Sequence, residues 1–158
     1  GYPTWSNQPN TDSFNLVQDL PASQLLFDCG VPLVYLPGFH VGAQLRISLP
    51  EMEQWVRGRG AIGDYLYWLY THNPIQQRLG IDDHFGRTWI IWDLINIAWL
   101  LNPSWVPSEL SPAAALRNDT CWQRDLPGRH LLREAYGIDR DAIFRDLFAK
   151  LERATNSQ

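Results

Sequence analysis

The pattern of apolar and polar positions predicts both helices and strands in the first part of the chain. Asp19 precedes a short apolar-periodic segment, Leu20–Asp28, and can cap it as a helix. Pro21 falls in the first turn of that helix and Gly30 just beyond its end, the usual places for these residues. The apolar segment Val31–Leu36 then predicts a short buried strand. A helix followed by a strand is typical of an α/β fold.

Two more helices are predicted from the middle of the chain. Residues Ser48–Glu51 form a capping-box pattern that opens a helix as far as about Arg57, and Gly58 and Gly60 end it. The next helical segment, Asp64–Thr71, is aromatic on nearly every side. Core packing is the favoured interpretation of those aromatic residues.

Three segments lack a clear period and are predicted as loops: Tyr2–Asn15, His72–Arg87 and, as loop or hairpin, Pro107–Gly128. His72 and His84 belong to the middle loop, where either could act as an acid, although a solvated surface position is favoured. A final helix capped by Asp139 has one apolar face, made of Ile143, Phe144, Leu147, Phe148 and Leu151.

Asp93 lies within an apolar run and is the first candidate for chemistry. Thr88–Ile91 predicts a buried strand and Leu94–Leu101 a helix, so Trp92 and Asp93 fall at the strand-to-helix junction. In open α/β sheets this carboxyl edge of the strands is where ligands bind. Asp93 could cap its helix by accepting backbone N–H groups, or it could be a metal ligand or an acid–base group.

Composition limits the classes of protein that need to be considered. The 158 residues suit one domain, with 45% hydrophobic and 19% charged residues, as in a soluble globular protein. The formal net charge of −4 favours neither nucleic acid nor an anionic membrane as partner. Cys29 and Cys121 are too few for a disulfide scaffold and are interpreted as reduced thiols. The apolar run Thr88–Leu101 is too short to span a membrane, and the cytoplasm is the default compartment.

Several short motifs together resemble the nucleoside hydrolases of the inosine-uridine-preferring family. The segment Ser6–Asn15 and the following Val17–Ala22 resemble the family's G-N-x-T-P-x-A-E-F-N and its Asp-Pro-Glu-Ala helix start. Cys29–Leu33 is similar to Ser-Gly-Val-Pro-Ile, and Trp92-Asp93-Leu94 to the His-Asp or, in purine-preferring members, Trp-Asp motif. Ile138–Phe144 resembles the last helix. The order and spacing of these motifs, from about Asn7 to Leu151, carry the resemblance.

The resemblance implies a fold and a set of site residues. The fold expected is the carboxyl-terminal part of an open, mostly parallel sheet flanked by helices, in one partial domain. Asp93 matches a calcium ligand, and Trp92 the residue that stacks on the leaving base. The positions expected to bind the sugar are Asn7, Ser13, Phe14 and Asn15.

Two departures from the family pattern change what is expected of the site. Ser13 stands where the family has Glu, so a charge that would bind a sugar hydroxyl is replaced by a short neutral group. The family's D-x-D-x-x-x-D-D signature, which supplies most calcium carboxylates, has no match. We therefore expect a fragment, a processed piece, or a subunit completed by an amino-terminal chain or by a second copy of itself. One carboxylate is too few to hold calcium.

The activity that the resemblance implies is calcium-assisted hydrolysis of the N-ribosidic bond of purine nucleosides. Nucleosides are the expected substrates, and neither nucleic acid nor a membrane is an expected partner. A non-catalytic nucleoside- or sugar-binding or interaction protein is the alternative, favoured by Ser13 and by the unmatched carboxylate signature. A carbohydrate-binding module rests only on the eight Trp residues.

Overall fold

The computed structural model describes residues 13–156, which form a mixed α/β structure of two compact units. Unit 1 takes in residues up to 44 together with 92–138, and unit 2 residues 45–91 together with those from 139 onward. Each unit is therefore built from two separate stretches of the chain. The prediction of one partial domain stays a prediction.

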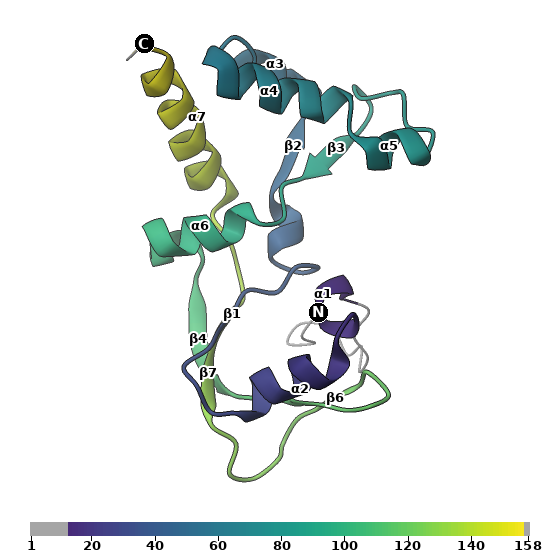
Figure 1. Ribbon diagram of the computed structural model, residues 1–158. Helices are drawn as coiled ribbons and strands as arrows, with labels where there is room; N and C mark the ends of the chain where they lie inside the picture. The colour runs from purple at the N-terminus through teal and green to yellow at the C-terminus, as the bar shows by residue number, and fades with distance from the viewer. Residues whose placement is uncertain (1–12, 157–158) are drawn as a thin grey trace. The chain divides into compact units, whose positions relative to one another are not determined.

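Unit 1 contains a small mixed sheet of three strands in the order β1-β7-β4 (Figure 1). β1 runs parallel to the central strand β7, pairing Val34 with Arg133, and β4 runs antiparallel to it, pairing Leu110 with Arg133. A second, two-stranded antiparallel sheet joins β5 to β6. The elements of unit 1 are α1 (Phe14–Val17), α2 (Leu20–Asp28), β1 (Val34–Tyr35), η1 (Gly42–Gln44), α6 (Leu94–Leu101), η2 (Pro103–Trp105), β4 (Ser108–Pro112), β5 (Ala115–Leu116), β6 (Trp122–Gln123) and β7 (Leu131–Ala135).

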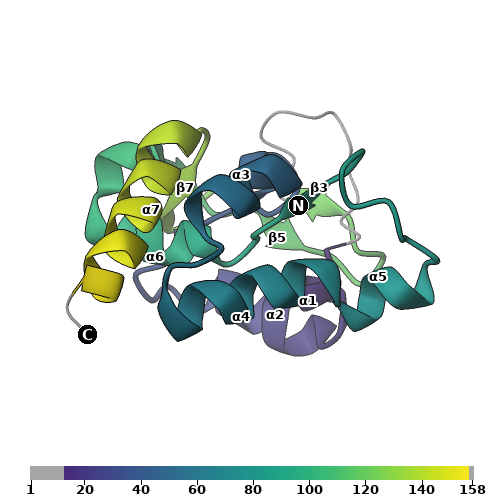
Figure 2. The same cartoon turned by 90° about the horizontal axis from the view of Figure 1, so that it is seen from above.

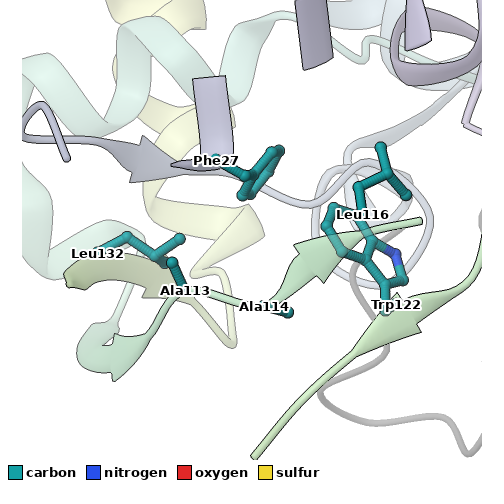
Figure 3. Packing of buried hydrophobic residues seen from close by; sticks show 6 residues of the cluster. All are labelled: Phe27, Ala113, Ala114, Leu116, Trp122 and Leu132. Carbon is teal, nitrogen blue, oxygen red and sulfur yellow. The ribbon is translucent and has the colours of Figure 1, made fainter. Parts of the chain in front are cut away.

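The core of unit 1 forms where α2 packs against the β5–β6 pair and β7. Figure 3 shows its buried residues, which are Phe27, Ala113, Ala114, Leu116, Trp122 and Leu132. The Phe27 ring meets Tyr35 and Trp122 edge-on, with ring centroids 5.4 and 5.0 Å apart. This geometry is favoured between aromatic rings. Tyr35 thereby connects the core to the cavity described below.

β7 also carries a buried carboxyl group. Glu134 is 1% exposed and accepts a hydrogen bond from the Ser111 hydroxyl at 3.3 Å. Burial raises the pKa of Glu134 to about 7, against the lowering effects of Arg124 and Ser111, and Glu109 raises it further. Because the folded protein then holds this proton more tightly than the unfolded chain, the carboxyl group costs stability increasingly as the pH rises from about 4.5 through 7.

The described residues of unit 2 form a two-stranded antiparallel ribbon, β2–β3, and four helices. Figures 1 and 2 both show α3 and α4 lying side by side, and α3 follows directly on β2. The elements are β2 (Arg46–Ser48), α3 (Leu49–Trp55), α4 (Gly60–Thr71), α5 (Pro74–Arg78), β3 (Thr88–Ile90) and α7 (Arg140–Asn156). The N-terminal residue of α7, Arg140, donates to the carbonyl of Arg46 and pairs with Glu51 at 2.5 Å.

The predicted helix boundaries are confirmed where the sequence has a capping residue. The Asp19 carboxylate accepts the Ala22 N–H at 3.0 Å at the start of α2, and Asp139 accepts that of Ala142 at 3.0 Å at the start of α7. The Ser48–Glu51 capping box is formed in both directions. α6 spans Leu94–Leu101 as predicted.

The open, mostly parallel sheet is not confirmed, because β1–β7 is the only parallel pair within residues 13–156. β3 pairs in an antiparallel ribbon instead. The predicted loop His72–Arg87 contains α5, and the loop or hairpin Pro107–Gly128 contains β4 as well as β5 and β6. β7 was not predicted, and α4 begins at Gly60 rather than Asp64. No helix in the described part of the chain is long and apolar enough to cross a membrane.

Candidate functional site

Unit 1 contains a cavity of about 520 Å³ formed by three separate segments of the chain. The first is α1 with its preceding residue, the second is the end of β1 with the turn after it, and the third is the start of α6. The lining residues are Ser13, Phe14, Asn15, Leu16, Tyr35, Leu36, Gly38, Phe39, Trp92, Asp93, Ile95 and Asn96. A volume of this size suits a ligand as large as a nucleoside.

Trp92 is the largest side chain in the cavity and is held against the turn that follows β1. Its ring meets Phe39 edge-on, with centroids 6.0 Å apart and planes at 78°. Gly38 and Gly42 lie beside it, and a Cβ at either would make an ordinary van der Waals contact with the indole at 3.8 Å. The turn itself is closed by hydrogen bonds from Gly42 N–H to Pro37 O and from Ala43 N–H to Gly38 O. Trp92 remains 40% exposed, so part of its side chain is open to a ligand.

Asp93 precedes α6, yet its side chain does not cap the helix. Its backbone is already helical (φ −83°, ψ −7°), and the side chain accepts no capping hydrogen bond. The N–H of Asn96 bonds instead to the backbone carbonyl of Asp93 at 3.2 Å. Asp93 is exposed and is the single carboxylate among the described residues that line the cavity. Its carboxylate is therefore available to a ligand, because the capping role considered for it is not realised.

The α1 side of the cavity presents an aromatic ring and short polar groups. Phe14 is 72% exposed, which is unusual for a phenyl ring in a folded protein. Asn15 is exposed beside it, and Ser13 precedes the helix without capping it through its side chain. α1 is anchored to α2 by a hydrogen bond of 2.9 Å from the Ser23 hydroxyl to the Leu16 carbonyl.

Five of the six predicted site residues line this one cavity, although they lie some 80 residues apart in the sequence. They are Ser13, Phe14, Asn15, Trp92 and Asp93. Asn7 lies outside the residues that the structure describes. Their roles toward a ligand stay predictions.

Sequence reasoning missed the residues that shape the middle of the cavity, from Tyr35 to Phe39. The Pro37-Gly38 turn directly after the predicted strand was a signal for them, because such a turn often borders a site at a strand end. Asn96 was also missed. It stands three residues after Asp93, and residues at this spacing share a helix face.

Calcium requires more oxygen ligands than the described part of the cavity offers. Calcium takes about six to eight oxygen atoms, mostly from carboxylates. Asp93 is one carboxylate, and the amides of Asn15 and Asn96 and the Ser13 hydroxyl are neutral. Among residues 13–156 no group of three or more His, Cys, Asp or Glu side chains is arranged to hold a metal ion. The described residues therefore do not fit a calcium site by themselves.

The two histidines considered as acids belong to unit 2. His72 stacks on Trp68, with ring centroids 5.0 Å apart, and its Nδ1 lies 2.8 Å from the Thr71 hydroxyl. His84 lines a different cavity and contacts the ring of Tyr70. Their proposed role on a leaving base stays untested.

Solved structures of nucleoside hydrolases have a fold similar to that of this chain. A plant nucleoside hydrolase and a purine-preferring ribonucleoside hydrolase from Gardnerella vaginalis each align with a TM-score of 0.69 at 17% identity. Each alignment covers 91% of this chain and 47% of the solved chain, so the chain spans about half the length of these structures. No protein-family model matches the sequence, and no curated protein matches it. The chain thus has a partial nucleoside-hydrolase-like fold.

Proposed function

We propose that this chain provides the base- and sugar-binding part of a site that hydrolyses the N-ribosidic bond of purine nucleosides. The observation that carries the proposal is the cavity in which Trp92 and Asp93 face the Phe14–Asn15 segment, within a partial nucleoside-hydrolase-like fold. In the reaction, water adds across the bond between the anomeric carbon and the base nitrogen. The carbon keeps the hydroxyl group and the departing base takes the proton.

Trp92 is assigned to the base. An indole with an open face can stack on the two fused rings of a purine, and this contact favours the base as it leaves. Phe39 packs edge-on against the indole, and this contact orients the ring before a ligand arrives. A pyrimidine covers less of the indole and gains less from the contact.

The sugar is assigned to the α1 side of the cavity. The amide group of Asn15 can donate to and accept from ribose hydroxyls, and Phe14 provides an apolar wall. The motif resemblance adds Asn7, which lies outside the described residues, as a second amide for the sugar. Ser13 replaces a charged acceptor by a hydroxyl, which weakens the hold on one sugar hydroxyl. Asp93 is assigned as one calcium ligand, and the remaining ligands would come from outside the described residues, including a complementing chain.

A second function is favoured by the single carboxylate in the cavity. A protein that binds nucleosides or their sugars without hydrolysing them needs Trp92 and the polar groups of the α1 segment, but no metal. The two functions therefore differ in calcium dependence and in turnover, and not in the identity of the binding residues.

The test measures inosine binding by calorimetry and hypoxanthine release by chromatography, using the protein purified from its source with any associated chain retained. The proposed hydrolase releases base with calcium and loses this activity in excess EGTA. Asp93→Asn lowers the release at least about 100-fold, as expected for a lost metal ligand. Asp82→Asn, a matched change at an exposed loop residue of unit 2, leaves it unchanged.

Binding that survives EGTA without any release of base would support the non-catalytic function instead. Absence of both binding and release would contradict both functions.

A further inference from the structure

Unit 2 has a cavity of its own, of about 290 Å³, that the proposed function does not use. It lies where the β2–β3 ribbon meets the end of α4, α5 and the loop before β3. The residues that line it are Arg46, Tyr70, Gln76, Ile81, His84, Arg87, Thr88 and Trp89. Its size is near the lower end of the range for small-molecule pockets. We call it the Arg46–Arg87 pocket.

The charges of the Arg46–Arg87 pocket are all of one sign. Arg46 and Arg87 are exposed, and neither guanidinium forms an ion pair within residues 13–156. Asp82 and Asp83 precede Arg87 closely in the chain, yet the Asp83 carboxylate accepts the backbone N–H groups of Phe85 and Gly86 instead. No described carboxylate lines the pocket. Two unpaired guanidinium groups beside an imidazole are suited to an oxyanion, which they can bind through several charge-assisted hydrogen bonds.

Gln76 adds a second requirement, because it needs a hydrogen-bond donor from the ligand. Gln76 is only 4% exposed and is one of the few buried polar residues in the described part of the chain. Its Oε1 has no hydrogen-bond partner there. Tyr70 cannot supply the missing donor, because its hydroxyl already donates to the Arg87 carbonyl at 3.1 Å. The same hydroxyl also lies 3.4 Å from the carbonyl oxygen of Ile47. A buried acceptor without a partner is costly. A ligand in this pocket would therefore be favoured if it offered an O–H or N–H group as well as a negative charge.

We propose that the Arg46–Arg87 pocket binds hydrogen phosphate, either free or as a phosphate monoester with a neighbouring hydroxyl group. The guanidinium groups of Arg46 and Arg87 donate hydrogen bonds to the charged oxygens of the phosphate. The side-chain carbonyl of Gln76 accepts a hydrogen bond from its O–H group. Sulfate has the same shape and charge but no O–H at neutral pH, so the pocket should prefer phosphate to sulfate. The site does not depend on the nucleoside proposal, since the two cavities belong to different units.

The experiment titrates the 158-residue chain at pH 7 with inorganic phosphate, sulfate and glycerol 3-phosphate, by calorimetry. Phosphate should bind at least about 10-fold more tightly than sulfate, the discrimination expected when a buried acceptor is left unpaired. Arg46→Gln and Arg87→Gln should each weaken phosphate binding at least about 10-fold. Arg78→Gln, the same change at an exposed arginine of α5 outside the pocket, should alter it less than about 2-fold. Tighter binding of glycerol 3-phosphate than of phosphate would identify the ester as the ligand, and the reverse would identify the free ion.

The Gln76→Leu variant tests the donor requirement separately. It should bring the affinities for phosphate and sulfate within about 3-fold of each other, because the acceptor is gone while the arginines remain. Gln76→Glu keeps an acceptor at this position and serves if the leucine variant does not fold; its negative charge should abolish binding of both ions. The proposal is overturned if phosphate does not bind, if sulfate binds equally well to the unmodified chain, or if Arg78→Gln weakens binding as much as Arg87→Gln.

Discussion

Replacing Arg129 should destabilise unit 1 strongly. Its guanidinium donates to three backbone carbonyls, those of Ala113 at 2.7 Å, Phe27 at 2.8 Å and Ala114 at 3.2 Å. It also pairs with Asp28 at 2.6 Å. The side chain of Arg129 is 16% exposed, whereas that of Asp28 is 49% exposed. Arg129 thus joins the last turn of α2 to the segment between β4 and β5. The three residues whose carbonyls it binds belong to the core shown in Figure 3.

The size of the effect follows from these contacts. Hydrogen bonds to a charged group contribute roughly 1.5–3 kcal/mol each, and carbonyls that regain water recover part of this. The half-exposed ion pair with Asp28 adds at most about 1 kcal/mol. We expect Arg129→Met to lower the free energy of unfolding by about 3–5 kcal/mol and Asp28→Asn by no more than about 1 kcal/mol. Arg129→Lys should lose most of the stabilisation that Arg129 provides, because one ammonium group cannot reach three carbonyls in the same geometry.

Urea denaturation followed by circular dichroism measures these differences, and native-state hydrogen exchange of the β7 amides locates them in unit 1. Asp28→Asn is the control for the loss of the ion pair alone. The reasoning is refuted if Arg129→Met costs less than about 1 kcal/mol, or if Asp28→Asn costs as much as Arg129→Met.

Three further changes test other parts of the fold by urea denaturation. Because burial raises the pKa of Glu134 to about 7, Glu134→Gln should gain stability relative to the unmodified chain as the pH rises from 5 to 8, by at most about 3 kcal/mol; a pH-independent difference would contradict this. Gly63→Ala should destabilise α4 by about 1–3 kcal/mol, because its Cβ would lie 2.3 Å from the Val56 carbonyl oxygen, and unchanged stability would show that the backbone adjusts. Ser48→Ala removes the acceptor of the capping box and should cost about 1 kcal/mol, whereas an effect near zero would mean that Glu51 alone holds the start of α3.

Local signals in the sequence predicted α2, α3, α6 and α7, whereas α1 and α5 fell in segments predicted as loops, and the pairing of the strands could not be predicted. Asp19, Ser48 and Asp139 cap helices through their own side chains, so a few neighbouring residues specify each boundary. The partner of a strand is set by tertiary packing instead. Thr88–Ile90 has the composition of a buried sheet strand, yet it pairs with Arg46–Ser48 in an isolated ribbon. β7 alternates too weakly, with Arg133 and Glu134 at its centre, to be recognised before its neighbours are known.

The candidate site was predicted in part for the same reason. Trp92 and Asp93 stand at a strand-to-helix junction that the hydrophobic pattern reveals, and the α1 residues came from a resemblance of motifs. The turn that holds Trp92 was missed, because Pro37-Gly38 marks a turn in the sequence but does not show which side chain that turn will contact. The conformation of Asp93 was also beyond sequence reasoning, since a carboxylate before a helix normally caps it.

The central claim, that the Trp92 cavity binds a purine nucleoside, is tested most directly by the affinity of the chain for inosine and for uridine. Calorimetry on the unmodified chain should show tighter binding of inosine. Trp92→Ala should weaken inosine binding at least about 10-fold, as expected for a lost stacking contact of about 1–3 kcal/mol. It should also remove most of the preference for inosine over uridine. Trp68→Ala removes an indole of similar exposure from unit 2 and should change neither affinity. Equal losses for inosine and uridine in Trp92→Ala, or no binding of inosine by the unmodified chain, would contradict the account.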